Sequence, residues 1–181
     1  MGVPCYVMQH AAHYWFAVPP EEVWAAIEQL DQFEQWWGWL GHFQVEGPGL
    51  RSGVVLRGVV APPVPYRMQV EVQLQRCVPC RVVDALVSGD LAGDAHLTLD
   101  RISKGTVASV AWSLEMRQMP MRVAARLAYP LLRWGHDRVV EATVGAFGRH
   151  LEGRAEGAAS VVAADVGDLG GQRRPVEPAP H

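Results

Sequence analysis

The chain has 181 residues, with 16 basic and 19 acidic side chains and a formal charge of −3, a size that suits one domain better than two. Apolar residues make up 49% and charged residues 19% of the chain, which excludes wholesale disorder. This charge balance gives no electrostatic reason to expect nucleic acid or an anionic membrane as a partner.

Cysteine content and the start of the chain indicate the compartment. Three cysteines cannot make a disulfide framework and suit a reducing environment. The first 18 residues contain no Lys or Arg, unlike a signal peptide. Nowhere does a stretch of about 18 apolar residues offer a membrane span. We therefore expect a cytoplasmic protein with no stable membrane insertion, no cofactor and no bound metal.

The first elements in chain order are a strand and two short helices. A strand over about residues 10–18 meets a Pro-Pro-Glu-Glu segment at 19–22. Proline is tolerated in the first turn of a helix, and carboxylates are favourable at the positive end of the helix dipole. Apolar residues then recur at helical spacing, which predicts a helix over about 20–30 and a second short helix from Phe33 to Trp37.

The middle of the chain alternates like a sheet that is covered on one side. Met68, Val70 and Val72 alternate with polar residues, so one face of that strand is buried and the other is wet. Residues typical of turns separate the predicted strands of this region. Strands are predicted over about 40–45, 53–60, 66–76, 81–88, 94–102 and 106–117.

The last third is predicted to be one long helix followed by a tail. Helical periodicity runs from Pro120 to about Glu152, and Pro130 predicts a kink or a split. The apolar face of this helix contains Leu132, Val139, Val140, Thr143, Ala146, Phe147 and Leu151. We expect one ligand-binding domain over residues 1–154 and a disordered tail over 155–181.

Several short motifs occur in a characteristic order. They are Pro19-Pro20-Glu21-Glu22-Val23-Trp24, Phe33-Glu34-Gln35-Trp36-Trp37, Pro65-Tyr66, Gly89-Asp90-Leu91-Ala92-Gly93, Gly105-Thr106-Val107 with Trp112, and Trp134-Gly135-His136-Asp137. In this order they resemble the START-related helix-grip superfamily (SRPBCC), in its bacterial polyketide cyclase/dehydrase-like branch. The resemblance implies an α+β fold of the Bet v 1/START type, in which a curved antiparallel sheet wraps around a long C-terminal helix. It also implies a hydrophobic ligand pocket between sheet and helix, but no particular reaction.

His136 is the most informative polar residue, because its helical angle places it near the middle of the apolar face. It is either a cavity-facing imidazole that binds a ligand oxygen, or a core histidine bonded to a strand group or to Asp137. The aromatic residues before the sheet are either a lid at the pocket mouth or ordinary packing. The residues expected to contact a ligand are His136, Trp36, Trp37, Trp39, Tyr14, Phe16, Met68, Val70, Val72, Val139, Thr143 and Phe147.

Other polar patterns in the sequence give weaker evidence for a functional site. Cys77 and Cys80 match a C-x-x-C redox pair, but the motif joins two strands, so we interpret it as a plain turn. The polar residues Asp94, His96, Thr98 and Asp100 are assigned to the solvated convex face. Asp84 and Arg57 fit either face of their strands.

The function predicted from the sequence is binding of a small hydrophobic or amphipathic ligand, such as a lipid, an isoprenoid or a polyketide-like compound. The alternative is a polyketide cyclase, aromatase or dehydratase that uses the same cavity. An enzyme needs at least two titratable groups directed into the pocket, and only His136 is identified here. A third class, a protein interaction partner, would show an exposed apolar patch instead. Oligomeric state is left open.

Overall fold

The computed structural model describes residues 7–61, 67–118, 130–131 and 133–154. Some sequence predictions therefore lie outside the described residues. These are the strand opening at Pro65-Tyr66, the first part of the long helix after Pro120, the position of Leu132, and the tail from residue 155.

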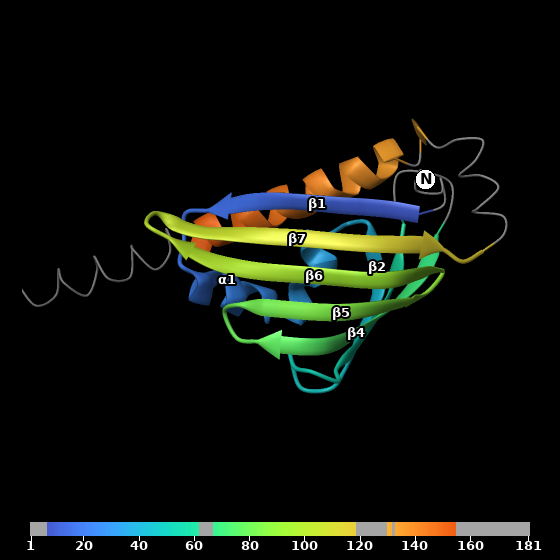
Figure 1. The fold of residues 1–181 in the computed structure, drawn as a ribbon, viewed down its shortest axis with the longest axis horizontal. Helices are drawn as coiled ribbons and strands as arrows, with labels where there is room; N and C mark the ends of the chain where they lie inside the picture. Colours follow the sequence, from blue (N-terminus) through green and yellow to red (C-terminus); the bar gives the residue numbers. More distant parts are fainter. Residues whose placement is uncertain (1–6, 62–66, 119–129, 132, 155–181) are drawn as a thin grey trace, which may run out of the picture.

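Seven strands in the described part of the chain form one antiparallel sheet (Figure 1). Its order is β1-β7-β6-β5-β4-β3-β2, so each strand from β2 onward pairs with the next and β1 closes against β7. The strands are β1 (Val7–Phe16), β2 (Leu40–Glu46), β3 (Val55–Val60), β4 (Met68–Val78), β5 (Val82–Gly89), β6 (Leu91–Ile102) and β7 (Gly105–Met116). The predicted order of a strand, short helices and six further strands is confirmed.

Alternation along each strand decides which side chains face the concave side. In β4, Met68 and Leu74 are buried, whereas Gln69 and Gln73 are exposed. Leu99 of β6 is also buried. A Gly at position 93 allows the backbone of β6 to lie against β7, since a Cβ there would stand 1.9 Å from the Ser113 carbonyl oxygen.

Two short helices and one 3-10 turn follow β1. Helix α1 (Pro20–Ile27) begins with proline and has two acids in its first turn, as predicted. It is shorter than the predicted 20–30, because Gln29 leaves the helical region at φ −79° and ψ 60°. The chain continues through η1 (Leu30–Gln32) and α2 (Phe33–Trp36). Val23 and Trp24 of α1 are buried against the sheet.

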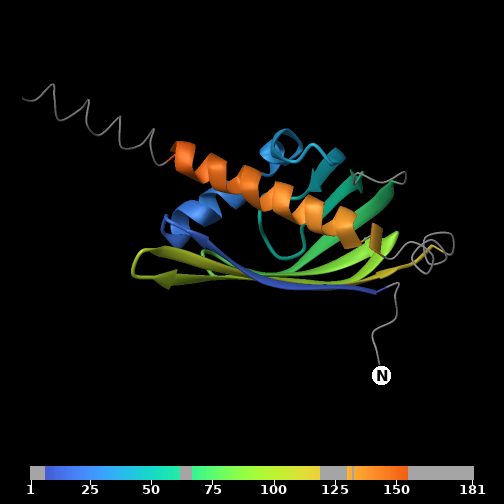
Figure 2. The ribbon, with the colours of Figure 1, turned by 90° about the horizontal axis from the view of Figure 1, so that it is seen from above.

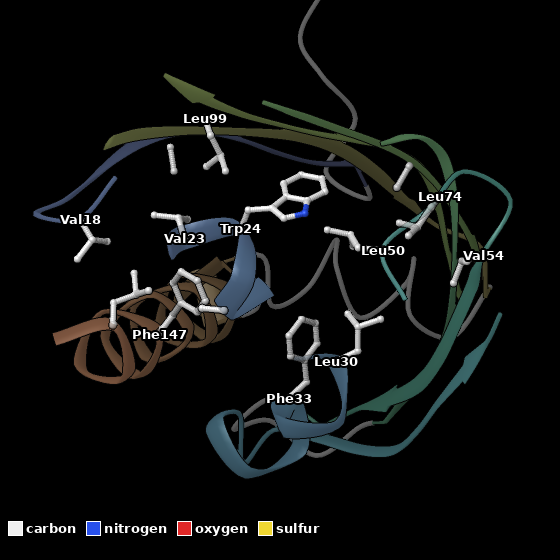
Figure 3. Close-up of a cluster of buried hydrophobic side chains, with 14 residues drawn as sticks. Val18, Val23, Trp24, Leu30, Phe33, Leu50, Val54, Leu74, Leu99 and Phe147 are labelled. Carbon is white, nitrogen blue, oxygen red and sulfur yellow. The ribbon is translucent and has the colours of Figure 1, made fainter. Parts of the chain in front are cut away.

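The C-terminal helix, described at residues 130–131 and 133–154, lies across the concave side of the sheet (Figure 2). Phe147 and Leu151 are buried, while Arg149 and Glu152 on the opposite side are exposed. Figure 3 shows the buried side chains of sheet, short helices and C-terminal helix pointing into the space that these elements enclose. The predicted arrangement, a curved sheet around a long helix, is confirmed.

A buried hydrogen bond joins the end of β1 to the start of β7. The Thr106 hydroxyl is fully buried and donates to the Val18 carbonyl oxygen at 2.7 Å. This bond satisfies a backbone acceptor where the chain leaves the sheet for α1.

None of the described helices is both long and apolar enough to cross a bilayer.

Candidate functional site

A cavity of about 490 Å³ lies between the concave face of the sheet, the short helices and the C-terminal helix. This volume falls within the roughly 300–1,000 Å³ of typical small-molecule sites. Carbon atoms dominate its wall, and among the described residues no Asp, Glu, Lys or Arg lines it.

The structure places most of the expected ligand contacts on the wall of this cavity. The lining contains Tyr14, Phe16, Trp37, Trp39, Met68, Val72, His136, Val139, Thr143 and Phe147. Trp36 and Val70 do not line it.

Trp36 and Val70 are held in packing instead. The Trp36 ring lies 4.3 Å from the His150 ring and 5.9 Å from the Phe147 ring, between α2 and the C-terminal helix. Val70 shares the concave face of β4, but it packs into a separate small cluster that contains Met116.

A polar group of side chains forms one end of the otherwise apolar cavity. His10 and Tyr14 share the inward face of β1, and His10 Nε2 lies 3.1 Å from the Tyr14 hydroxyl oxygen. The His10 ring stacks on Trp112, its direct partner on β7, at 4.3 Å between centroids. The His136 ring comes from the C-terminal helix and lies 5.5 Å from His10 and 5.6 Å from Trp112. Tyr14, Trp112 and His136 line the cavity, and His10, which does not line it, packs among their rings. We call these four residues the polar end of the cavity.

Burial favours the uncharged form of two of these groups. The pKa of His10 lies below its ordinary value, first because burial penalises the charged ring and second because of the neighbouring His136. Burial also raises the pKa of the Tyr14 hydroxyl. The polar end therefore offers hydrogen-bonding groups in which the uncharged forms of His10 and Tyr14 are favoured.

His136 shows features of both alternatives left open by its sequence. Its Nδ1 lies 3.3 Å from a carboxylate oxygen of Asp137, which is the local pair. Its ring also lines the cavity, and Nε2 is buried without a hydrogen-bond partner among the described residues. Asp137 itself is exposed and does not line the cavity.

Tryptophans connect the segment after α2 to the C-terminal helix. Trp39 Nε1 donates to Thr143 Oγ1 at 3.1 Å, and the Thr143 hydroxyl lies 2.6 Å from the Val139 carbonyl oxygen. Trp37 stacks on Trp39 at 5.5 Å with an interplanar angle of 10°. Both indoles thus form part of the cavity wall beside the C-terminal helix.

Comparison with known proteins rests on solved structures, because no family model and no curated protein matches the chain. TTHA0849 from Thermus thermophilus has a TM-score of 0.65 and 14% identity over 81% of this chain and 99% of that one. The ZhuI aromatase/cyclase from Streptomyces sp. R1128 has a TM-score of 0.65 and 13% identity over 82% and 96%. Ara h 8.0201 has a TM-score of 0.58 and 13% identity over 81% and 99%.

The chain has the helix-grip fold. This confirms the resemblance inferred from the motifs, at the level of the fold. At such identities the chemistry of a helix-grip cavity has to be argued from its own residues.

Sequence reasoning missed Trp112, which lines this helix-grip cavity, and His10, which packs against Trp112 and Tyr14. A signal for His10 was present, because side chains two and four residues apart share one face of a strand. An inward Tyr14 therefore implies an inward His10. No comparable signal exists for Trp112, since its place opposite His10 depends on the pairing of β1 with β7.

Outside the helix-grip cavity, the two residues of ambiguous direction lie on the convex face. Arg57 binds Glu71 at 2.7 Å and also contacts Glu46. Asp84 binds Arg76 at 2.7 Å and also contacts His96. These are surface ion pairs, and neither residue contributes to the cavity.

The C-x-x-C segment lies where two strands are joined by a turn. Cys77 belongs to β4, whereas Pro79, Cys80 and Arg81 connect β4 to β5. Burial raises the pKa of the Cys77 and Cys80 thiols. Redox cysteines need the opposite shift. Within the described ranges, no three His, Cys, Asp or Glu side chains gather to hold a metal ion.

Proposed function

We propose that this protein binds a small hydrophobic or amphipathic molecule, such as a lipid, an isoprenoid or a polyketide-like compound, in the helix-grip cavity. One observation carries the proposal: a cavity of about 490 Å³ whose described wall is mostly apolar, with the Tyr14 hydroxyl and the His136 ring at one end. Each Å² of apolar ligand surface removed from water contributes about 25 cal/mol. The polar end then gives a ligand with one polar group a fixed orientation.

The size of the cavity also argues for an occupant. Protein interiors are close-packed, and an apolar void costs about 24 cal/mol per Å³. Water would find few polar partners along this wall. A hydrophobic ligand relieves this cost.

Native mass spectrometry of the purified protein, with extraction of any released molecule, tests the proposal. We expect an added mass that disappears on organic extraction. Ala108 lines the cavity and Ala111 lies exposed on the opposite face of β7, which makes a matched pair of sites. Ala108→Phe should remove the adduct by filling the cavity, and Ala111→Phe should retain it. A parent protein that neither carries a ligand nor takes one up from a lipid extract would contradict the proposal.

A second candidate function is acid–base catalysis on the bound molecule, of the cyclase, aromatase or dehydratase type. The observation that favours it is that His10 and Tyr14 join His136 at one end of the cavity. The Tyr14 hydroxyl is suited to donate a proton to a carbonyl oxygen, while an unpartnered His136 Nε2 is suited to accept one from an adjacent carbon. One structural neighbour, ZhuI, is named an aromatase/cyclase.

Conversion of a short poly-β-ketone substrate separates the two functions. Catalysis predicts a cyclised product from the parent protein and loss of turnover in Tyr14→Phe, with binding retained. A parent protein that binds this substrate and returns it unchanged would remove the second candidate and leave ligand binding.

A further inference from the structure

Asp137, outside the cavity, determines which nitrogen of the His136 ring acts as the donor. A carboxylate only accepts hydrogen bonds, so the Nδ1 atom that lies 3.3 Å from Asp137 is the donor of this pair. In the tautomer with the hydrogen on Nδ1, Nε2 is an acceptor. It is buried, faces no donor among the described residues, and belongs to a ring on the cavity wall. A buried acceptor of this kind gains most from a ligand that brings a donor.

The cavity wall does not compensate a charged ligand for the hydration that it loses on binding. No Asp, Glu, Lys or Arg among the described residues lines the cavity, so a carboxylate or an ammonium group would lose its water without gaining one of these side chains as a counterion. Asp137 would also repel an anion placed beside His136. An uncharged ligand avoids both costs.

Tyr14 supplies a second contact at the same place. Its hydroxyl and the His136 ring are both neighbours of His10, so they face the same end of the cavity. When His10 Nε2 donates to the tyrosine oxygen, the tyrosine O–H remains free for a ligand oxygen. A ligand hydroxyl then accepts from Tyr14 and donates to His136, whereas an ether or ester oxygen can only accept.

We propose that the cavity selects uncharged hydrophobic molecules that carry a hydroxyl group, and that this group donates to His136 Nε2. The inference rests on the proposed ligand-binding function and names the class of ligand. Long-chain alcohols, hydroxylated polycyclic compounds and hydroxylated isoprenoids belong to this class. Fatty acids and fully etherified analogues do not.

Three fluorescent probes of one skeleton test the selection: pyrenebutanol, its methyl ether, and pyrenebutanoate. Each is titrated into the parent protein at neutral pH. We expect pyrenebutanol to bind about tenfold more tightly than the ether, the loss typical of a buried acceptor left unpaired. Hydrophobicity alone would favour the ether, which has one more carbon. Pyrenebutanoate should bind at least tenfold more weakly than the alcohol.

Variants on either side of the cavity wall identify the acceptor. His136→Phe should bring the alcohol and the ether to within about threefold of each other, because the ring is kept and the acceptor is lost. His13 lies on the opposite, exposed face of β1, where Nδ1 contacts the Ser109 hydroxyl. The matched change His13→Phe should leave the preference intact.

Asp137→Ala gives a test that does not alter the cavity wall. Without the carboxylate, either ring nitrogen can carry the proton, and an Nε2–H can donate to an ether oxygen. We expect the preference for the alcohol to fall at least threefold while the ether gains affinity. An unchanged preference in Asp137→Ala would overturn the assigned protonation of His136.

The possible failures are distinct. If none of the three probes binds, the proposed function fails together with the inference. If the probes bind and the ether equals the alcohol, or the carboxylate binds most tightly, the cavity is confirmed as a binding site and the selection for a hydroxyl group is overturned.

Discussion

At the scale of single residues, the informative side chains are those whose surroundings shift their pKa away from its ordinary value. His10 is the clearest case, because it is stacked on Trp112 and bonded to Tyr14. Burial lowers the pKa of His10 below its ordinary 6.5, and burial also lowers the pKa of His150. Protonation of His10 and His150 is therefore less favourable in the folded protein than in the unfolded chain.

This shift has a defined sign for stability. A histidine whose pKa is lower in the folded state stabilises the protein above pH 6.5, and the contribution is lost as pH falls toward the folded pKa. We predict that the free energy of unfolding in urea decreases between about pH 7.5 and about pH 5.5, a range in which most carboxylates stay ionised. His10→Gln should flatten this decrease, and His13→Gln should not. An equal slope in both variants would contradict the account of His10.

Phe147 joins the C-terminal helix to the sheet. It is 9% exposed, and its ring meets Phe16 edge-on at 5.6 Å. We predict that Phe147→Ala lowers the free energy of unfolding by about 3–5 kcal/mol, as other large-to-small changes in cores do. Arg149→Ala on the exposed side of the same helix should change it by less than about 0.5 kcal/mol. Similar losses in both variants would mean that the helix face is assigned wrongly.

At the scale of elements, the strands are where sequence and structure agree best. Alternation of apolar and polar residues is local, so the faces of β4 and β6 could be predicted from single segments. Asp84 and Arg57 could not be assigned, because apolar residues occupy both faces of their strands. Their direction is decided by partners on neighbouring strands, such as Arg76 for Asp84.

The two faces of β4 give a direct prediction. Val72 lines the cavity, and the neighbouring Gln73 is exposed. Val72→Asp should lower the free energy of unfolding by several kcal/mol, or shift the pKa of the new carboxyl upward, because an unpaired charge would face apolar side chains. Gln73→Asp should be nearly neutral. Urea unfolding of both variants checks the difference, and equal stabilities would contradict the assigned faces.

At the scale of the whole molecule, the cavity could be expected but its polar end could not. A bent sheet covered by a straight helix implies an enclosed space, which the order of elements already indicates. The polar end joins β1, β7 and the C-terminal helix, and β1 lies about one hundred residues or more from the other two in the chain. Contacts among these three elements depend on the register between strands, which cannot be read from a single sequence.

The extent of the domain is a separate prediction. We propose that residues 1–154 are sufficient for folding, because residues 155–181 lack periodicity and are rich in Ala, Gly, Arg and Pro. A chain ending at Arg154 should have the melting temperature of the full chain to within about two degrees in calorimetry, where a loss of 1 kcal/mol would shift it by about 2–8 degrees. A larger decrease would show that the last residues contribute to the fold.

The central claim is that ligands bind inside the cavity and not on the outer surface. Intermolecular nuclear Overhauser effects between bound pyrenebutanol and assigned methyl groups measure this directly. We predict contacts to the cavity residues Leu99, Val110 and Val139. Contacts confined to the exposed apolar residues Leu86, Ile102 and Leu131 would contradict the claim.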